Sequence, residues 1–245
     1  SLDGILEKII QYENSAGDLS WRKKLLVPAA ISNFGPQDNN GDGDANDPGE
    51  FYSPAQRTFG TDWGEALKAL AQNVGFGAYT LYEKTGCYDD GSAYPLTPCD
   101  NFISSANVLA EWQNHYGFVT WWAHGSGTTA SRFFWVNDDA GPNPADEMCQ
   151  QSESGWETFW QSNLCSQLSN DYPSFVVQVS CDNGFPENAN NLGYSLLRDG
   201  AIGTFSASRT SWYCVGPWTP DIGSGYGDNA SYGYQILKQI AGAEK

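Results

Sequence analysis

The sequence has few basic residues and no long apolar run, and each shortage argues against a class of function. Only 12 lysine and arginine residues stand against 29 aspartate and glutamate residues, which gives a formal net charge of −17. Such a chain repels the phosphates of nucleic acids and of anionic lipids. No segment approaches the roughly 20 apolar residues of a membrane-spanning helix. We therefore expect no nucleic-acid partner and no membrane span, and the acidity favours basic peptides or metal cations.

Histidine is also scarce, and the cysteines lack the spacing of metal ligands. The chain has two histidines and six cysteines, none of which forms a C-x-x-C pair, so a zinc finger is not expected. The spacing favours two local disulfides, Cys87–Cys99 and Cys149–Cys165, although six cysteines allow other pairings. Disulfides form in oxidising compartments. We therefore expect a secreted or cell-surface protein, whose export signal has been removed or lies upstream.

Apolar runs typical of buried strands alternate along the chain with amphipathic stretches typical of helices. Strands are predicted at residues 25–31, 77–82, 118–123, 175–180 and 201–206. Helices are predicted at residues 2–10, 62–72, 104–115, 155–169, 187–198 and 231–240. This alternation predicts an α/β fold with a mostly parallel central sheet and helices on both faces.

A histidine and a cysteine directly follow two of the predicted strands. His124 and Gly125 follow the strand at 118–123, and Cys181 follows the strand at 175–180. Functional residues of open α/β sheets gather at the carboxyl ends of the strands. If the two strands are neighbours, the imidazole can activate the thiol as a nucleophile. The alternative is a structural histidine and a buried or disulfide-bonded cysteine.

The segments around these residues resemble the gingipains, within the caspase-like cysteine peptidases. The similar segments are WAHGS at 122–126, VSCDNGF at 179–185, LGYSLLRDGAIG at 192–203 and SASRTSW at 206–212. The resemblance covers nearly the whole chain in patches. It implies a three-layer caspase-like fold and a cysteine endopeptidase that works through a thioester intermediate.

The resemblance also implies roles for individual residues. Cys181 is expected to be the nucleophile and His124 its general base, with the backbone N–H groups of Cys181 and Gly125 as the oxyanion hole. The family places an acidic residue after the first strand to orient the histidine, and Asn33 occupies the matching position here. An asparagine can orient an imidazole by a hydrogen bond, but it supplies no negative charge. A turn residue is the alternative for Asn33.

Two further residues are candidates for substrate binding. Trp212 matches the tryptophan that lines the first specificity pocket of gingipains, although a core or surface tryptophan is the alternative. Asp62 lies close to the pocket aspartate of the arginine-specific members, or it is an N-cap of the helix that follows. With the acidic surface, Asp62 suggests cleavage after arginine or lysine.

The acidic segment 38–47 has the oxygen-ligand spacing of a calcium-binding loop. Its candidate ligands are Asp38, Asn40, Asp42, Asp44 and Asn46, with a glycine at the sixth position. The glutamate expected at the twelfth position is absent, so the segment does not match a helix-loop-helix EF-hand. We expect a structural calcium ion, and a solvated acidic loop is the alternative. Gingipains also bind calcium.

The domain organisation and three rival functions complete these expectations. We expect residues 1–245 to form one α/β catalytic unit and, because gingipain catalytic regions are longer, a fragment of a larger precursor whose other fragments are partners. A Cys181–Cys214 disulfide would favour an inactive homologue that acts as a structural or assembly subunit. Ten tryptophans also suit a secreted carbohydrate-binding module, and 29 acidic residues allow a two-carboxylate glycosidase. Water and amine attack on the thioester, hence endopeptidase and transpeptidase activity, are both left open.

Overall fold

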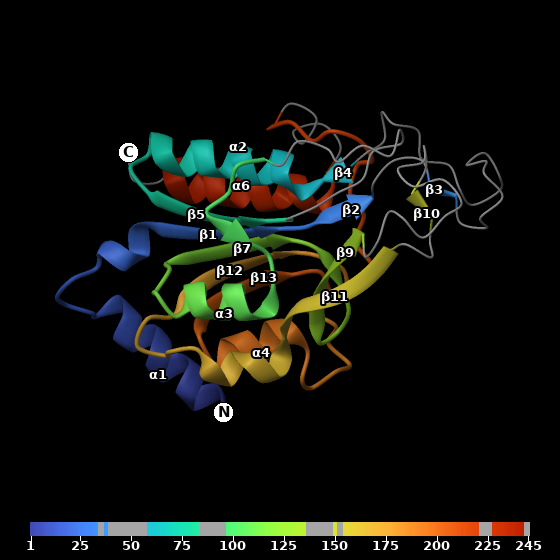
Figure 1. Cartoon of the computed structure of the whole chain (residues 1–245). Coiled ribbons are helices and arrows are strands. Elements are labelled where there is room, and N and C mark those ends of the chain that lie inside the picture. The colour runs from blue at the N-terminus through green and yellow to red at the C-terminus, as the bar shows by residue number, and fades with distance from the viewer. Residues whose placement is uncertain are drawn as a thin grey trace.

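A parallel sheet forms the centre of the molecule. The computed structural model describes residues 1–33, 37–38, 58–83, 97–135, 149–150, 154–220 and 227–242. Within them, a six-stranded sheet has the order β13–β12–β7–β1–β5–β6, and all of its pairs are parallel (Figure 1). The strands are β1 (Lys24–Ala29), β5 (Gly77–Tyr82), β6 (Asn101–Phe102), β7 (Phe118–Trp122), β12 (Ser174–Val179) and β13 (Ala201–Ser206). The predicted α/β fold is confirmed.

Helices cover both faces of this sheet, as Figure 1 shows. One face carries α2 (Gly60–Asn73) and α6 (Asn229–Gly242), and the other carries α1 (Leu2–Glu13), α3 (Ser105–Trp112) and α4 (Leu192–Arg198). Neighbouring residues of β1 serve opposite cores: Leu25 packs with the α2 side, whereas Leu26 packs with the α3 and α4 side. A strand buried on both faces needs a continuous apolar run, which is why these strands could be recognised in the sequence.

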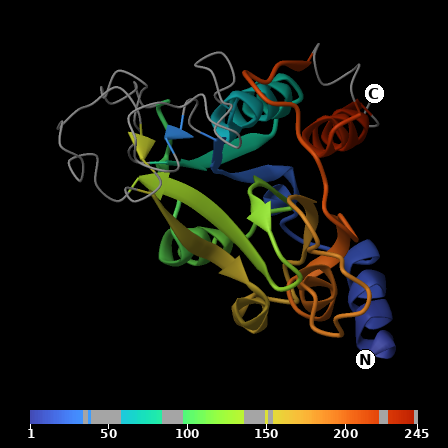
Figure 2. The same ribbon diagram turned by 90° about the vertical axis from the view of Figure 1, so that its right-hand side faces the viewer.

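A second, antiparallel sheet lies beside the carboxyl ends of the central strands. It consists of β8 (His124–Gly125), β9 (Thr129–Trp135) and β11 (Ser154–Gln161), in the order β11–β9–β8. Figure 2 looks onto this edge of the molecule and shows the yellow-green β9 beside the yellow β11. The helix predicted at 155–169 is therefore wrong: the segment is a strand followed by the 3-10 helix η4 (Ser162–Gln167).

The boundaries of the other elements differ from the predictions by a few residues. The helix predicted from residue 187 begins at Leu192, because the side chain of Asn191 caps it by accepting a hydrogen bond from the Tyr194 N–H at 2.8 Å. The strand predicted at 25–31 is divided into β1 and β2 (Ile31–Asn33) at Ala30, whose N–H donates instead to the Trp122 carbonyl.

Three short strands and one 3-10 helix complete the description. β2 pairs with β4 (Thr58–Phe59), β3 (Gln37–Asp38) pairs with β10 (Cys149–Gln150), and η1 (Ser20–Lys23) precedes β1. Among the helices that the structure describes, none is both long enough and apolar enough to cross a bilayer.

Candidate active site

The register of two parallel strands places His124 and Cys181 at the same edge of the sheet. β7 and β12 are neighbours, with Trp122 opposite Val179, and the Ala123 N–H donates to the Val179 carbonyl at 3.0 Å. His124 and Cys181 each follow their strand's last residue by two positions. The expected adjacency of the two strands is confirmed. The other histidine, His115, precedes β7 and therefore lies at the opposite edge.

The imidazole of His124 is held by a backbone carbonyl. Its Nε2 lies 3.1 Å from the carbonyl oxygen of Ser32. Because a carbonyl only accepts, Nε2 carries the proton of the neutral ring and Nδ1 is left as the basic nitrogen. Burial lowers the pKa of His124 below its ordinary 6.5, and the bond to Ser32 opposes this shift. The ring is therefore neutral at neutral pH, the state in which an imidazole acts as a base.

The expected third member of the site, Asn33, is the residue next to this carbonyl. Asn33 lies in β2, but its side chain is outside what the structure describes. The contact that the structure does give to His124 comes from the Ser32 backbone. The sequence carries no signal for it, since every residue has a carbonyl group.

Cys181 begins a tight turn after β12. Its Sγ donates to the carbonyl of Ser211 at 3.3 Å, and the side chain is partly buried. The next residue, Asp182, has a positive φ of 56°, and its N–H donates to the Arg209 carbonyl. A non-glycine residue in this region marks a constrained backbone. The turn thus fixes the direction in which the thiol leaves the sheet.

Gly125 packs directly on the backbone of Cys181. A Cβ atom at Gly125 would lie 2.8 Å from the Cys181 nitrogen and closer still to its carbonyl oxygen. The Ser126 N–H donates to the Thr129 carbonyl, so the next pair of the hairpin, Gly125 with Ala130, is a non-hydrogen-bonded pair. The Gly125 N–H therefore points away from β9. The Cys181 N–H donates a hydrogen bond to no described residue. Both expected oxyanion donors therefore make no hydrogen bond to the described part of the chain.

A buried amide that the sequence analysis missed joins the cysteine turn to the histidine hairpin. Asn183 is fully buried, and its Nδ2 donates to the carbonyls of Ser126 at 2.6 Å and Thr129 at 2.8 Å. Its Oδ1 accepts from the Ser180 hydroxyl, which in turn accepts from the indole of Trp121 at 3.0 Å. The Asn–Gly pair after Cys181 was the available signal, but it indicates only a turn. Asn183 thus fixes the distance between the two candidate catalytic segments.

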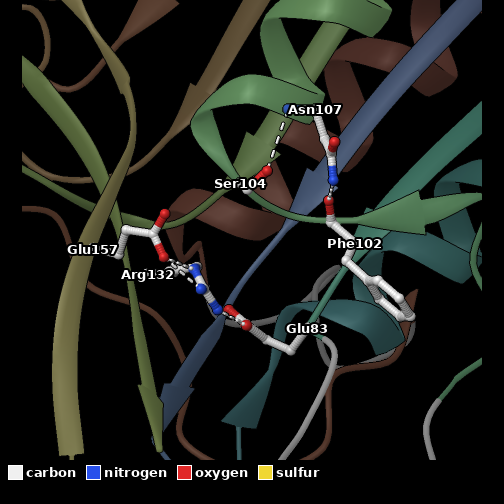
Figure 3. Close-up of polar contacts among 6 residues, drawn as sticks. All are labelled: Glu83, Phe102, Ser104, Asn107, Arg132 and Glu157. Atoms are coloured by element: carbon white, nitrogen blue, oxygen red, sulfur yellow. Dashed lines mark hydrogen bonds and ion pairs between the residues drawn. The ribbon is translucent and has the colours of Figure 1, made fainter. Parts of the chain in front are cut away.

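An ion-pair cluster anchors the strand behind His124. Arg132 of β9 contacts Glu83 and Glu157, both at 2.5 Å, as Figure 3 shows. Burial raises the pKa of Glu83 to about 7, and Arg132 opposes this shift. Glu83 follows β5, so the cluster ties the antiparallel sheet to the edge of the central sheet.

A cavity of about 640 Å³ lies beside Cys181. Ser211, whose carbonyl accepts from the thiol, lines it together with Trp212, Cys214, Asp228 and Tyr232. Trp212 is 79% exposed, so it is a surface residue at the cavity rather than a core tryptophan. Its role in specificity stays a prediction.

Asp62 does not line this cavity. It lies in the first turn of α2, where it accepts a hydrogen bond from the backbone of Trp218, and burial raises its pKa. The N-cap interpretation is wrong, because the N-cap residue is Phe59 and makes no side-chain cap bond. The carboxylate that does line the cavity is Asp228, which accepts from the Cys214 N–H at 3.0 Å and from the Ser231 N–H at 2.7 Å.

The cysteines that the structure describes in full are not oxidised. Cys99, Cys165, Cys181 and Cys214 are free thiols, so neither predicted local disulfide nor a Cys181–Cys214 bond is formed. Cys165 is a residue of η4 that is buried in the core, and Cys149 pairs along β10 with β3. Cys87 lies outside the described residues.

The predicted calcium loop lies almost entirely outside the described residues. Asp38 belongs to β3, whereas Asn40, Asp42, Asp44 and Asn46 are not described. Within the described ranges, no three histidine, cysteine or acidic side chains gather as a metal site. The calcium ligands therefore stay a prediction.

Comparisons with known proteins agree with this geometry. The family model described as peptidase family C25 matches residues 1–242. The crystal structure of the Arg-specific cysteine proteinase gingipain R has a TM-score of 0.56 and 12% identity, over 99% of this chain and 42% of that chain. The complex of RgpB pro- and mature domains from Porphyromonas gingivalis has a TM-score of 0.52 and 15% identity, over 87% of this chain and 39% of that chain. No curated protein matches.

The solved structures and the family model support different conclusions. At such low identity the solved structures establish the fold alone, and the chain spans less than half the length of either. The family match, in contrast, extends over nearly all of the residues. The chain belongs to peptidase family C25, the gingipain family of cysteine peptidases.

Proposed function

We propose that the chain is the catalytic unit of a secreted cysteine endopeptidase, with Cys181 as nucleophile and His124 as base. The observation that carries the proposal is the β7–β12 register, which brings both residues to one edge with Gly125 packed on Cys181. Family membership supports the peptidase class. The acidic surface, which keeps an exported protein soluble, and the resemblance to gingipains support secretion.

The proposed reaction proceeds through a thioester. Nδ1 of His124 takes the thiol proton, and the sulfur attacks the carbonyl carbon of the scissile bond to form a C–S bond. The C–N bond then breaks, its electron pair goes to nitrogen, and the imidazolium returns the proton to the leaving amine. Water, deprotonated by the same nitrogen, attacks the thioester and releases the thiol and the acid. An amine in place of water would give a new peptide bond.

The Gly125 and Cys181 N–H groups are the proposed donors to the oxyanion. Both belong to a rigid contact, because the backbone of one residue lies against that of the other. Preorganised donors of this kind stabilise the developing negative charge without reorganising during the reaction.

We propose that the cavity beside Ser211 binds the side chain that precedes the scissile bond, with Trp212 as its wall. Its carboxylate, Asp228, forms no ion pair with any described lysine or arginine. A buried carboxylate without a cationic partner favours an incoming cation. This supports a preference for arginine or lysine before the scissile bond. Asp228, in place of Asp62, is then the pocket aspartate that binds the basic side chain.

Three further proposals follow from the sequence. The segment that contains Asp38, Asn40, Asp42, Asp44 and Asn46 binds a structural calcium ion through its oxygen ligands. Other fragments of a larger precursor associate with this chain, which is consistent with its partial coverage of the gingipain structures. The macromolecular substrate is a peptide or protein.

The second candidate function is an inactive homologue that serves as a structural subunit. It is favoured by the hydrogen bond from Cys181 Sγ to the Ser211 carbonyl, because a thiol hydrogen directed at that carbonyl is not directed at His124. Digestion of an unfolded protein, followed by mass spectrometry of the cleaved bonds, separates the two functions. Cleavage after arginine and lysine that is absent in Cys181→Ala supports the peptidase. Absence of cleavage supports the inactive homologue, and equal cleavage after alanine or leucine rejects the basic preference.

A further inference from the structure

An exposed tryptophan lies beside His124, and neither residue lines the cavity. The indole of Trp156 meets the imidazole edge to face, with ring centroids 4.6 Å apart and an angle of 77° between the planes. Phe133 lies behind it, with centroids 4.9 Å apart. Trp156 is nevertheless 61% exposed, which is unusual for so large an apolar side chain between two aromatic neighbours.

The strand register explains why these residues share a face. His124 is opposite Ser131, and Phe133 is opposite Trp156, so cross-strand pairing and alternation place all four on one side of the small sheet. Thr158 lies on the same side, because its hydroxyl is 3.1 Å from that of Ser131. Among these five residues only His124 has a side chain that can take up a charge.

The charged residues of the same strands lie on the other side. Arg132 and Glu157 are opposite each other, and Arg132 binds both Glu157 and Glu83, so the pair faces the edge of the central sheet. Figure 3 shows this cluster, in which the guanidinium lies between the two carboxylates. The surface beside His124 therefore offers an apolar aromatic wall.

The chemistry of acyl transfer indicates which side of the scissile bond this aromatic wall contacts. The imidazolium must protonate the leaving amine, so the residue after the scissile bond departs on the imidazole side. We place the acyl side at the cavity, because Ser211, whose carbonyl accepts from the Cys181 thiol, lines it. We propose that Trp156, backed by Phe133, binds the side chain that follows the scissile bond and selects a large apolar residue there. This inference rests on the proposed peptidase function.

The acyl-enzyme can react either with water or with an added amine. The ratio of the two products tests this subsite separately from acylation. A peptidyl-arginine methyl ester acylates Cys181 and releases methanol, after which water competes with an added amine. In the amine reaction the C–N bond forms, the C–S bond breaks, and the amine proton passes through His124 to the thiol. The ratio of amide product to acid product does not depend on the number of active sites. It therefore measures only how well the amine binds and reacts on the leaving-group side.

We expect the wild type to prefer phenylalaninamide to glycinamide by about tenfold, as one apolar pocket allows. Trp156→Ala should reduce this preference below about twofold, and Trp156→Phe should retain most of it. The control is Tyr172→Ala, an exposed aromatic residue that precedes β12 at the opposite edge of the sheet and should keep the wild-type ratio.

Three results would overturn the inference, and they differ in what they leave of the peptidase function. Normal ester hydrolysis with no preference in the wild type, or with the full preference in Trp156→Ala, would remove the subsite and leave the peptidase function intact. Failure of the wild type to form an acyl-enzyme would reject the peptidase function, and this subsite with it.

Discussion

The Cα atom of Gly125 lies against the backbone of Cys181, so closely that a Cβ atom there would lie 2.8 Å from the Cys181 nitrogen. The contact joins the residue after the candidate base to the candidate nucleophile. Because the obstructing atoms are backbone, they cannot rotate away as a flexible side chain can. The spacing of the two catalytic segments therefore depends on the absence of a side chain at this position.

Gly125→Ala should lower the rate of peptide hydrolysis by at least about 100-fold, the cost of one displaced oxyanion donor. Gly127→Ala, in the same hairpin, is the matched control, because the closest atom to its Cβ would be the side-chain nitrogen of Asn188 at 3.1 Å, which can rotate away. Initial rates at saturating substrate, with circular dichroism as a test of folding, measure the effect. Equal rates in the two variants would show that the contact has no part in catalysis.

The candidate site could be predicted from the sequence only where side-chain chemistry carries the signal. The apolar runs that end in His124 and Cys181 are buried on both faces, so their strands and their common edge could be predicted. The Ser32 carbonyl could not, because a backbone group leaves no mark in composition. Asn183 was equally hidden, since an asparagine before glycine predicts a turn whether or not its amide is buried.

The helix predicted at 155–169 was wrong for an identifiable reason. Trp156, Phe159 and Trp160 have the i, i+3, i+4 spacing of a helix face. In the structure a register irregularity between Thr158 and Trp160 buries both Phe159 and Trp160 in one strand. A β-bulge of this kind imitates helical spacing in a short window.

Asn183→Ala should destabilise the fold by about 3 kcal/mol, because it leaves the buried Ser180 hydroxyl and two partly buried carbonyls without their partner. Equilibrium urea unfolding measures this loss. The control Asn14→Ala removes one exposed hydrogen bond, to the Ile10 carbonyl, and should change stability by less than about 0.5 kcal/mol. Similar unfolding midpoints for the two variants would contradict the structural role of Asn183.

Glu83 should make stability fall as the pH rises. Burial raises its pKa from the ordinary 4.5 to about 7. Between these values the folded state keeps a proton that the unfolded state has lost, so folding is favoured at the lower pH. From pH 5 to pH 8 the wild type should lose about 2.5 kcal/mol relative to Glu83→Gln, which cannot ionise.

Urea unfolding of both proteins at a series of pH values measures that difference. Glu7→Gln, at an exposed position of α1, is the control and should follow the wild type. A constant difference between wild type and Glu83→Gln across the range would mean that Glu83 is ionised throughout, with Arg132 outweighing its burial.

Calcium should stabilise the protein if the acidic segment binds it. At about 100 times its dissociation constant, an ion that binds only the folded state adds about 2.7 kcal/mol. The double variant Asp42→Ala, Asp44→Ala should lose this increment, whereas Asp3→Ala on the exposed part of α1 should keep it. Unfolding curves of the wild type that coincide in calcium and in a chelator would exclude the site.

The most direct test of the central claim is alkylation by a peptidyl chloromethylketone that carries arginine next to its reactive group. The adduct is located by mass spectrometry under reducing conditions with calcium present. The account predicts rapid modification of Cys181, not of Cys214, and its loss in His124→Ala. Modification of Cys181 at the same rate with and without His124, or none in the wild type, would contradict a Cys181–His124 dyad.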